Sequence, residues 1–79
     1  LMPRVLKWRG FLFHFYSADG GEPPHIHVMK DGADCKIWLT SLKLAYNRGL
    51  SDRDLKAVHD KTGEMQDAFL EAWYDFFGK

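Results

Sequence analysis

The hydrophobic period of this chain changes once, near residue 50, and that change limits the folds open to it. Before this point apolar residues alternate with others, so that a strand would place Phe11, Phe13 and Phe15 on one face. After it they recur at helical spacings of three and four: Leu55, Val58, Thr62, Met65, Phe69, Ala72 and Phe76. The order predicts an α+β fold, in which a small antiparallel sheet packs against one C-terminal helix.

The alternating half predicts a sheet over residues 3–46. Its first hairpin joins residues 5–8 to residues 11–16 through the two-residue turn Arg9-Gly10. Residues 17–24 are rich in Gly, Asp and Pro and indicate a loop. Further along the chain, the alternation of Leu42 and Leu44 predicts a short fifth strand beside the four strands of the two hairpins. A turn is expected at Asn47-Arg48-Gly49.

A second hairpin is predicted around Asp31-Gly32, because a type I′ turn needs positive φ at both central residues. It joins residues 25–30 to residues 33–39. The two-residue loop fixes the register, in which Val28 faces Cys35 on an apolar face. The opposite face then carries three cross-strand pairs: His25 with Trp38, His27 with Lys36, and Met29 with Asp34.

The helical half begins at Ser51, a favourable N-cap, with Asp54 at the capping-box position. The unbroken apolar stripe predicts one long helix over about residues 52–77, ended by Gly78. Gly63 supports the alternative, a break in its vicinity, since glycine inside a helix costs about 1 kcal/mol relative to alanine.

Size and charge narrow the functional classes. A chain of 79 residues predicts a single domain over 1–79. Its one cysteine excludes an internal disulfide framework and fits a reducing compartment, so we expect a cytoplasmic protein with no membrane contact. The formal net charge is zero, which argues against a general polyanion binder. The net charge is zero because the positive charge of a basic first half, residues 1–48, balances the negative charge of an acidic second half.

The most distinctive motif is Glu-Pro-Pro-His-Ile-His, in which His25 and His27 point the same way on a strand, about 7 Å apart along the backbone. Two imidazoles on one face can share a metal ion or act as acid and base. Asp19 and Glu22 are close enough in sequence to complete such a site. Three interpretations stay open: a zinc site, a proton-transfer site, and simple packing of His25 on Trp38.

Two further surfaces are candidates for binding. Seven basic residues with aromatic neighbours could contact a nucleic-acid backbone, or could be ordinary solvated charges: Arg4, Lys7, Arg9, Lys30, Lys36, Lys43 and Arg48. The end of the helix is apolar over more of its circumference than one sheet covers. We therefore expect a homo-oligomer or a partner protein to contact five of its residues: Phe69, Leu70, Trp73, Tyr74 and Phe77.

Several segments together resemble a known family. They are Phe-x-Phe-Tyr-Ser-x-Asp-Gly-Gly-Glu-Pro-Pro-His-x-His-Val at Phe13 to Val28, Ala-x-x-Lys-x-Trp-Leu from Ala33, Leu-Ala-x-Asn-Arg-Gly from Leu44, and Trp-x-x-x-Phe-Gly from Trp73. The chain resembles the bacterial domain of unknown function 4160, which has no established biochemistry. Its members resemble small cytoplasmic proteins often encoded beside a member of the domain of unknown function 2442, an arrangement that suggests a toxin–antitoxin pair. The resemblance then implies that an inhibitory or nucleic-acid-cleaving activity centres on the two histidines of the motif.

The leading interpretation is a binding or protein-interaction module, with the face of His25 and His27 as its functional surface. Its binding residues would be Asp19, Lys36, Trp38 and Arg48. The alternative is a small RNase or another histidine-dependent enzyme. In that case His25 and His27 are acid and base, Glu22 orients one imidazole, and Arg48 or Lys36 stabilises a phosphate. No cofactor is firmly indicated; zinc on the two histidines is the only candidate.

Overall fold

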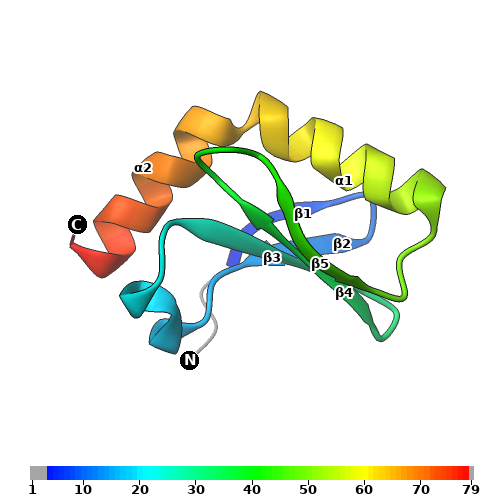
Figure 1. Ribbon diagram of the computed structural model, residues 1–79, viewed down its shortest axis with the longest axis horizontal. Coiled ribbons are helices and arrows are strands. Elements are labelled where there is room, and N and C mark those ends of the chain that lie inside the picture. Colours follow the sequence, from blue (N-terminus) through cyan, green and yellow to red (C-terminus); the bar gives the residue numbers. More distant parts are fainter. Residues whose placement is uncertain (1–3, 79) are drawn as a thin grey trace.

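The computed structural model describes residues 4–78, and these form an α+β fold. Figure 1 shows two helices laid across one face of a five-stranded antiparallel sheet. The expected start of the sheet at residue 3, and residues 1, 2 and 79 of the expected domain, lie outside the described residues. The elements follow in the order β1 (Arg4–Trp8), β2 (Phe11–His14), η1 (a 3-10 helix, Ser17–Gly21), β3 (His25–Lys30), β4 (Ala33–Trp38), β5 (Leu44–Arg48), α1 (Asp52–Glu64) and α2 (Gln66–Phe77).

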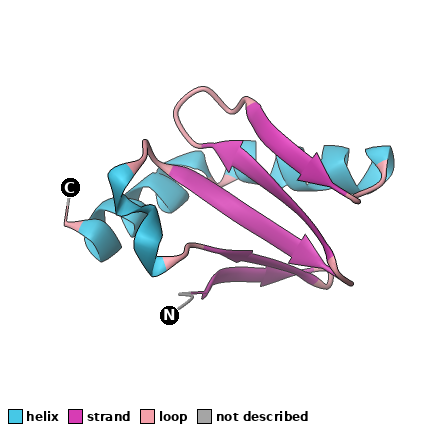
Figure 2. Ribbon diagram, turned by 60° about the horizontal axis from the view of Figure 1, so that its bottom comes forward, coloured by secondary structure: helices cyan, strands magenta, loops and turns pink. Residues whose placement is uncertain are grey.

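The sheet is a meander in which each strand pairs with the next one along the chain (Figure 2). Both predicted hairpins are confirmed, including the register from Lys30 opposite Ala33 to His25 opposite Trp38. The second turn has φ of 51° at Asp31 and 82° at Gly32, the left-handed backbone that a type I′ turn needs. Local turn chemistry therefore fixes which side chains share a face.

A fifth strand is present, but it begins at Leu44, and Leu42, which was expected to belong to it, lies before it with a φ of 62°. Of the turn predicted at Asn47-Arg48-Gly49, the first two residues belong to the strand. The sheet continues to Arg48, because the Arg48 guanidinium binds the Asp34 carboxylate across the ladder, at 3.0 and 2.8 Å. The Asn47 side chain exchanges two hydrogen bonds with the backbone of Leu50. The turn follows the strand instead, at Gly49, where φ is 95°.

The prediction of one long helix is also wrong: α1 ends at Glu64 and α2 begins at Gln66, with Met65 between them at ψ 10°. The break lies two residues after Gly63. The Gln66 amide donates to the carbonyls of Leu39 and Thr40, at 2.7 and 3.2 Å, which anchors the start of α2 to the β4–β5 connection. The predicted N-cap at Ser51 is confirmed: its hydroxyl accepts from the Asp54 backbone N–H at 3.1 Å.

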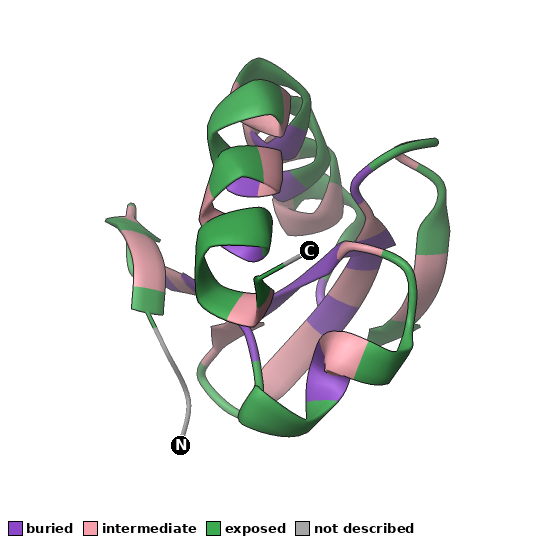
Figure 3. Cartoon of the chain, turned by 90° about the vertical axis from the view of Figure 1, so that its left-hand side faces the viewer, coloured by how far each residue is buried: buried purple, intermediate pink, exposed green. Residues whose placement is uncertain are grey.

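The apolar core lies between the sheet and the helices, as the buried positions in Figure 3 show. Cys35 is buried within it, as predicted. Phe69 and Trp73 are 0% and 2% exposed, so two of the five expected partner contacts belong to the core instead. Their rings pack on Phe13 and Phe15, with centroids 5.6 and 5.2 Å apart.

The other three expected partner contacts differ in exposure: Leu70 and Phe77 are half-buried, and Tyr74 is exposed. Phe76, on the same helix, is exposed as well. Among the described residues, neither helix has the length and apolar content that a bilayer crossing requires.

Candidate metal centre

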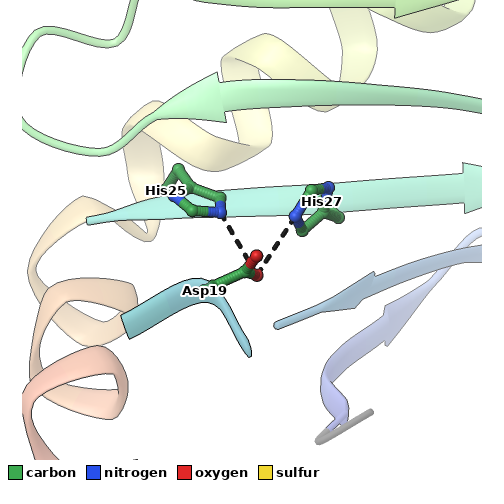
Figure 4. A group of neighbouring side chains, drawn as sticks. All are labelled: Asp19, His25 and His27. Atoms are coloured by element: carbon green, nitrogen blue, oxygen red, sulfur yellow. Dashed lines mark hydrogen bonds and ion pairs between the residues drawn. The ribbon is translucent and has the colours of Figure 1, made fainter. Parts of the chain in front are cut away.

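The sheet face opposite the helices is covered at one end by η1, which brings Asp19 over the first residues of β3 (Figure 4). The Asp19 carboxylate oxygen Oδ2 lies 3.2 Å from Nε2 of His25 and 3.1 Å from Nε2 of His27. The three ligand atoms all lie within 4.8 Å of one another. Residues separated by a proline-rich loop thus meet at one buried point.

The sequence builds this approach through a tight local turn. Oδ2 of Asp19 accepts a hydrogen bond from the Tyr16 backbone N–H at 2.8 Å, and the Asp19 N–H donates to the Tyr16 carbonyl at 2.9 Å. A Cβ added at Gly20 would lie 2.8 Å from the ring of Phe77, so η1 packs closely on the end of α2. The carboxylate is therefore held in place by η1 itself.

The proton on the His25 ring can be assigned from its partners. Nδ1 lies 2.9 Å from the Pro23 carbonyl oxygen, which can only accept, so Nδ1 carries a proton. In the neutral ring Nε2 then presents a lone pair. Nε2 is buried and makes no hydrogen bond among the described residues, although the Asp19 carboxylate is 3.2 Å away. Two hydrogen-bond acceptors therefore face each other inside the protein.

His27 is held at both ring nitrogens. Nε2 is within hydrogen-bond distance of Asp19, and Nδ1 lies 3.4 Å from the Tyr46 hydroxyl. Burial lowers the pKa of His27 to about 4, against the opposing effect of the Asp19 charge, so the ring is neutral near pH 7. When Tyr46 donates its proton to Asp34, the His27 proton is on Nδ1 and Nε2 is free to bind a cation.

Sequence reasoning did not assign four residues around this cluster: His14, Tyr16, Asp34 and Tyr46. The β2–β3 pairing places His14 opposite His27, with the two rings stacked at 5.5 Å. His14 is buried, and burial lowers its pKa. The Tyr16 ring lies edge-on to both histidines. The alternation of residues 11–16 was the available signal, since it places His14 and Tyr16 opposite the phenylalanine face.

Three of the predicted site residues take other roles. Glu22 does not orient an imidazole: its carboxylate is 4.0 Å from Nδ1 of His25, a distance beyond a hydrogen bond, and the Pro23 carbonyl holds that nitrogen instead. Glu22 pairs with Lys36, and this hydrogen bond lowers the pKa of Glu22. Arg48 pairs with Asp34. Both cations expected to hold a phosphate are therefore already matched by acids.

Trp38 lies beside the cluster, as the register predicted. Its ring packs edge-on against His25 with centroids 5.6 Å apart, and the Lys36 ammonium lies over its face at 4.6 Å. The His25 ring also packs against Trp73, with centroids 5.0 Å apart. His25 thus contacts two indoles and is fully buried.

The set of one carboxylate and two imidazoles suits a transition-metal ion, zinc or ferrous iron. Ligands about 2.0–2.1 Å from a tetrahedral zinc ion lie about 3.3 Å apart. The two nitrogen–oxygen distances of the cluster, 3.2 and 3.1 Å, are close to that value. Five surface hollows of the described residues, the largest about 480 Å³ in volume, are lined by residues other than Asp19, His25 and His27.

Comparison with known protein families identifies a match over most of the chain. The model of the family described as "Domain of unknown function (DUF4160)" matches residues 10–74. No curated protein and no solved structure matches the chain. The matched segment contains Asp19, His25 and His27, together with the strands and helices that hold them.

Proposed function

The chain belongs to the family of the domain of unknown function DUF4160, and we propose that it is a small binding module that holds a zinc ion between Asp19, His25 and His27. One observation carries the proposal. The buried Nε2 of His25 has no proton in the neutral ring, yet it faces a carboxylate oxygen at 3.2 Å. A cation between the two atoms would turn this repulsive contact into coordination.

The surroundings of the cluster support the proposal. In metal sites, a ligating histidine usually donates its second ring N–H to a carbonyl, a carboxylate or another polar group, which orients the ring. The Pro23 carbonyl has this position for His25, and the Tyr46 hydroxyl has it for His27. Three protein ligands leave a fourth position for water or another small ligand.

The alternative explanation without a metal is a protonated His25 paired with Asp19. That pair would donate from Nε2 to the carboxylate, but the contact at 3.2 Å lacks hydrogen-bond geometry. Metal coordination avoids this mismatch.

Zinc titration by calorimetry tests the proposal. We expect one zinc ion per chain for the wild-type protein, and binding at least a hundredfold weaker in His25→Ala, His27→Ala and Asp19→Asn. Asp19→Asn keeps the size of the side chain, so this variant can still test the site if an alanine variant unfolds. His59→Ala, which changes a histidine on α1 that contacts Leu42, is the matched control and should bind as the wild type does. Equal zinc binding in all five proteins would contradict the proposal.

The alternative of a small RNase is less well supported. His25 and His27 are 0% and 6% exposed, whereas acid–base catalysis on a polymer needs both groups to reach the substrate. RNA cleavage that persists in a chelator and disappears in His27→Ala would favour this alternative over the metal site.

A second candidate function, contact with a partner protein, is supported by the exposed aromatic rings of α2. Tyr74 and Phe76 are 47% and 40% exposed, more than a helix serving only the core needs. A toxin–antitoxin pair is one form of this proposal. Expression in a bacterium with and without the neighbouring gene tests it. Growth arrest that the neighbour relieves, and that a His25/His27 double variant abolishes, would support the pair; normal growth in every case would reject it.

A further inference from the structure

We propose that the free edge of β1 is a docking site for an acidic, extended segment of a partner protein, which would add to the sheet as a sixth strand. The inference is independent of the metal site. β1 is the first strand in the sheet order, and within residues 4–78 it pairs only with β2. Its outer edge therefore presents backbone N–H and C=O groups that a further strand can use.

The charges on β1 indicate the chemistry of that strand. Arg4, Lys7 and Arg9 lie on β1 and its turn, all are exposed, and none forms an ion pair among residues 4–78. Acidic residues on an added strand would pair with them across the ladder. β5, at the opposite edge, differs: its cation, Arg48, is already bound to Asp34.

A hollow between β1 and α2, lined by apolar side chains together with the charged Arg4 and Asp75, gives the added strand a further contact. It has a volume of about 430 Å³ and is lined by Arg4, Val5, Phe15, Ala72, Asp75 and Phe76. In the view of Figure 3, β1 lies at the left beside α2. β1 is irregular between Arg4 and Leu6, and beyond this point Leu6 and Trp8 pair with Phe13 and Phe11 of the core face, whereas Lys7 pairs with Leu12. Because side chains alternate along a strand, the partner side chains beside Leu6 and Trp8 would point to the helix side, where the hollow lies, and the others would face Lys7. The partner segment should therefore alternate apolar and acidic residues.

The same charges argue against a second copy of this chain. Pairing of β1 with β1 would bring the cations of both copies to one ladder, and like charges directly opposite destabilise a sheet. Basic residues on an edge strand are a known way to prevent such self-pairing. A nucleic acid would satisfy the cations but not the backbone groups of the edge, so it fits less well than an acidic strand.

Two capped eight-residue peptides test the proposal, one alternating valine and glutamate and one alternating valine and lysine. We expect the glutamate peptide to bind and to shift the NMR amide signals of residues 4–8. The lysine peptide should bind at least tenfold more weakly. An eight-residue oligothymidylate tests the nucleic-acid alternative: if it binds more tightly than the glutamate peptide, the proposal is overturned.

Two variants test the surface itself. Lys7→Glu should weaken binding of the glutamate peptide about tenfold, whereas Lys43→Glu, an exposed cation away from β1, should leave it unchanged. Ala72→Trp should fill the hollow and weaken binding, with circular dichroism to check the fold. Equal binding of both peptides, shifts at β5 instead of β1, or no binding at millimolar peptide would each overturn the proposal.

Discussion

The two faces of the sheet are both closed to solvent at their centres, but by different chemistry. On the helix side, aromatic and aliphatic side chains such as Phe13, Phe69 and Trp73 exclude water. On the other side, His14, His25 and His27 are buried under η1 and Tyr16. A void in apolar packing lowers the stability of a protein, and so does a buried polar group that has no hydrogen-bond partner. The comparison teaches that the second face depends on hydrogen-bond partners, and among the described residues Nε2 of His14 and Nε2 of His25 have none.

The largest expected effect is on the apolar face. Phe13→Ala should lower the free energy of unfolding by about 3–5 kcal/mol, because it leaves a cavity against Phe69. Leu12→Ala, the neighbouring residue on the opposite face, is half-buried and should cost less. Urea denaturation measures both. A larger loss for Leu12→Ala would mean that the two faces do not differ in this way.

Zinc should act on the polar face alone. At a free zinc concentration a hundred times the Kd, the free energy of unfolding should rise by about 2.7 kcal/mol, because only the folded chain assembles the site. Asp19→Asn should lose this gain, and EDTA should remove it from the wild type. Thermal unfolding with zinc and with EDTA measures the difference. A Phe13→Ala protein that still folds should keep the full zinc-dependent rise in the free energy of unfolding. A smaller rise in this variant would show that the two faces are energetically coupled.

Tyr46→Phe should have a smaller effect. It removes the hydroxyl that contacts His27, Asp34 and Arg48, at a cost of about 1 kcal/mol in stability. Zinc affinity should fall about tenfold to a hundredfold, as when other groups that orient metal-binding histidines are lost. Tyr74→Phe, on exposed α2, is the control and should change neither quantity. Unaltered zinc affinity in Tyr46→Phe would show that His27 is oriented without Tyr46.

The smallest effect concerns the rim of the polar face. The hydrogen bonds from Arg48 lower the pKa of Asp34, so this pair adds stability above the ordinary Asp pKa and loses it as pH falls through the lowered value. Because Arg48 is exposed and solvent screens the pair, the loss should be the smallest of the predicted effects. Arg48→Gln should reduce the loss of stability on acidification. Urea unfolding at neutral and at strongly acidic pH gives the comparison, and an unchanged acid dependence would contradict it.

The sequence was sufficient where structure is local. The turn at Asp31-Gly32 determines the register that aligns His25 and His27, and Ser51 determines the start of α1. Distant contacts decided the rest. The helix breaks where Gln66 bonds the carbonyls of Leu39 and Thr40, which no helical periodicity encodes.

The residues of the candidate site also fall into two groups: those that the local sequence indicated and those that distant contacts bring in. Asp19, His25 and His27 were recognisable because they lie within nine residues of one another in a motif of unusual composition. His14 and Tyr46 were not assigned, because strand neighbours outside the hairpin bring them in. Glu22 was expected to orient one imidazole, but the Pro23 carbonyl does this for His25. Every residue has a backbone carbonyl, so the sequence does not indicate which of them will accept a hydrogen bond.

The contact between η1 and the end of α2 has a consequence for biosynthesis. Gly20 lies against the Phe77 ring, and the His25 ring lies against Trp73. A ribosome makes η1 and β3 long before it makes α2, so the histidine cluster is without its outer wall while the chain is still being extended. Enclosure of Asp19, His25 and His27 therefore follows the synthesis of α2, and a metal ion that binds the cluster would meet its outer wall only after Trp73 and Phe77 have been made.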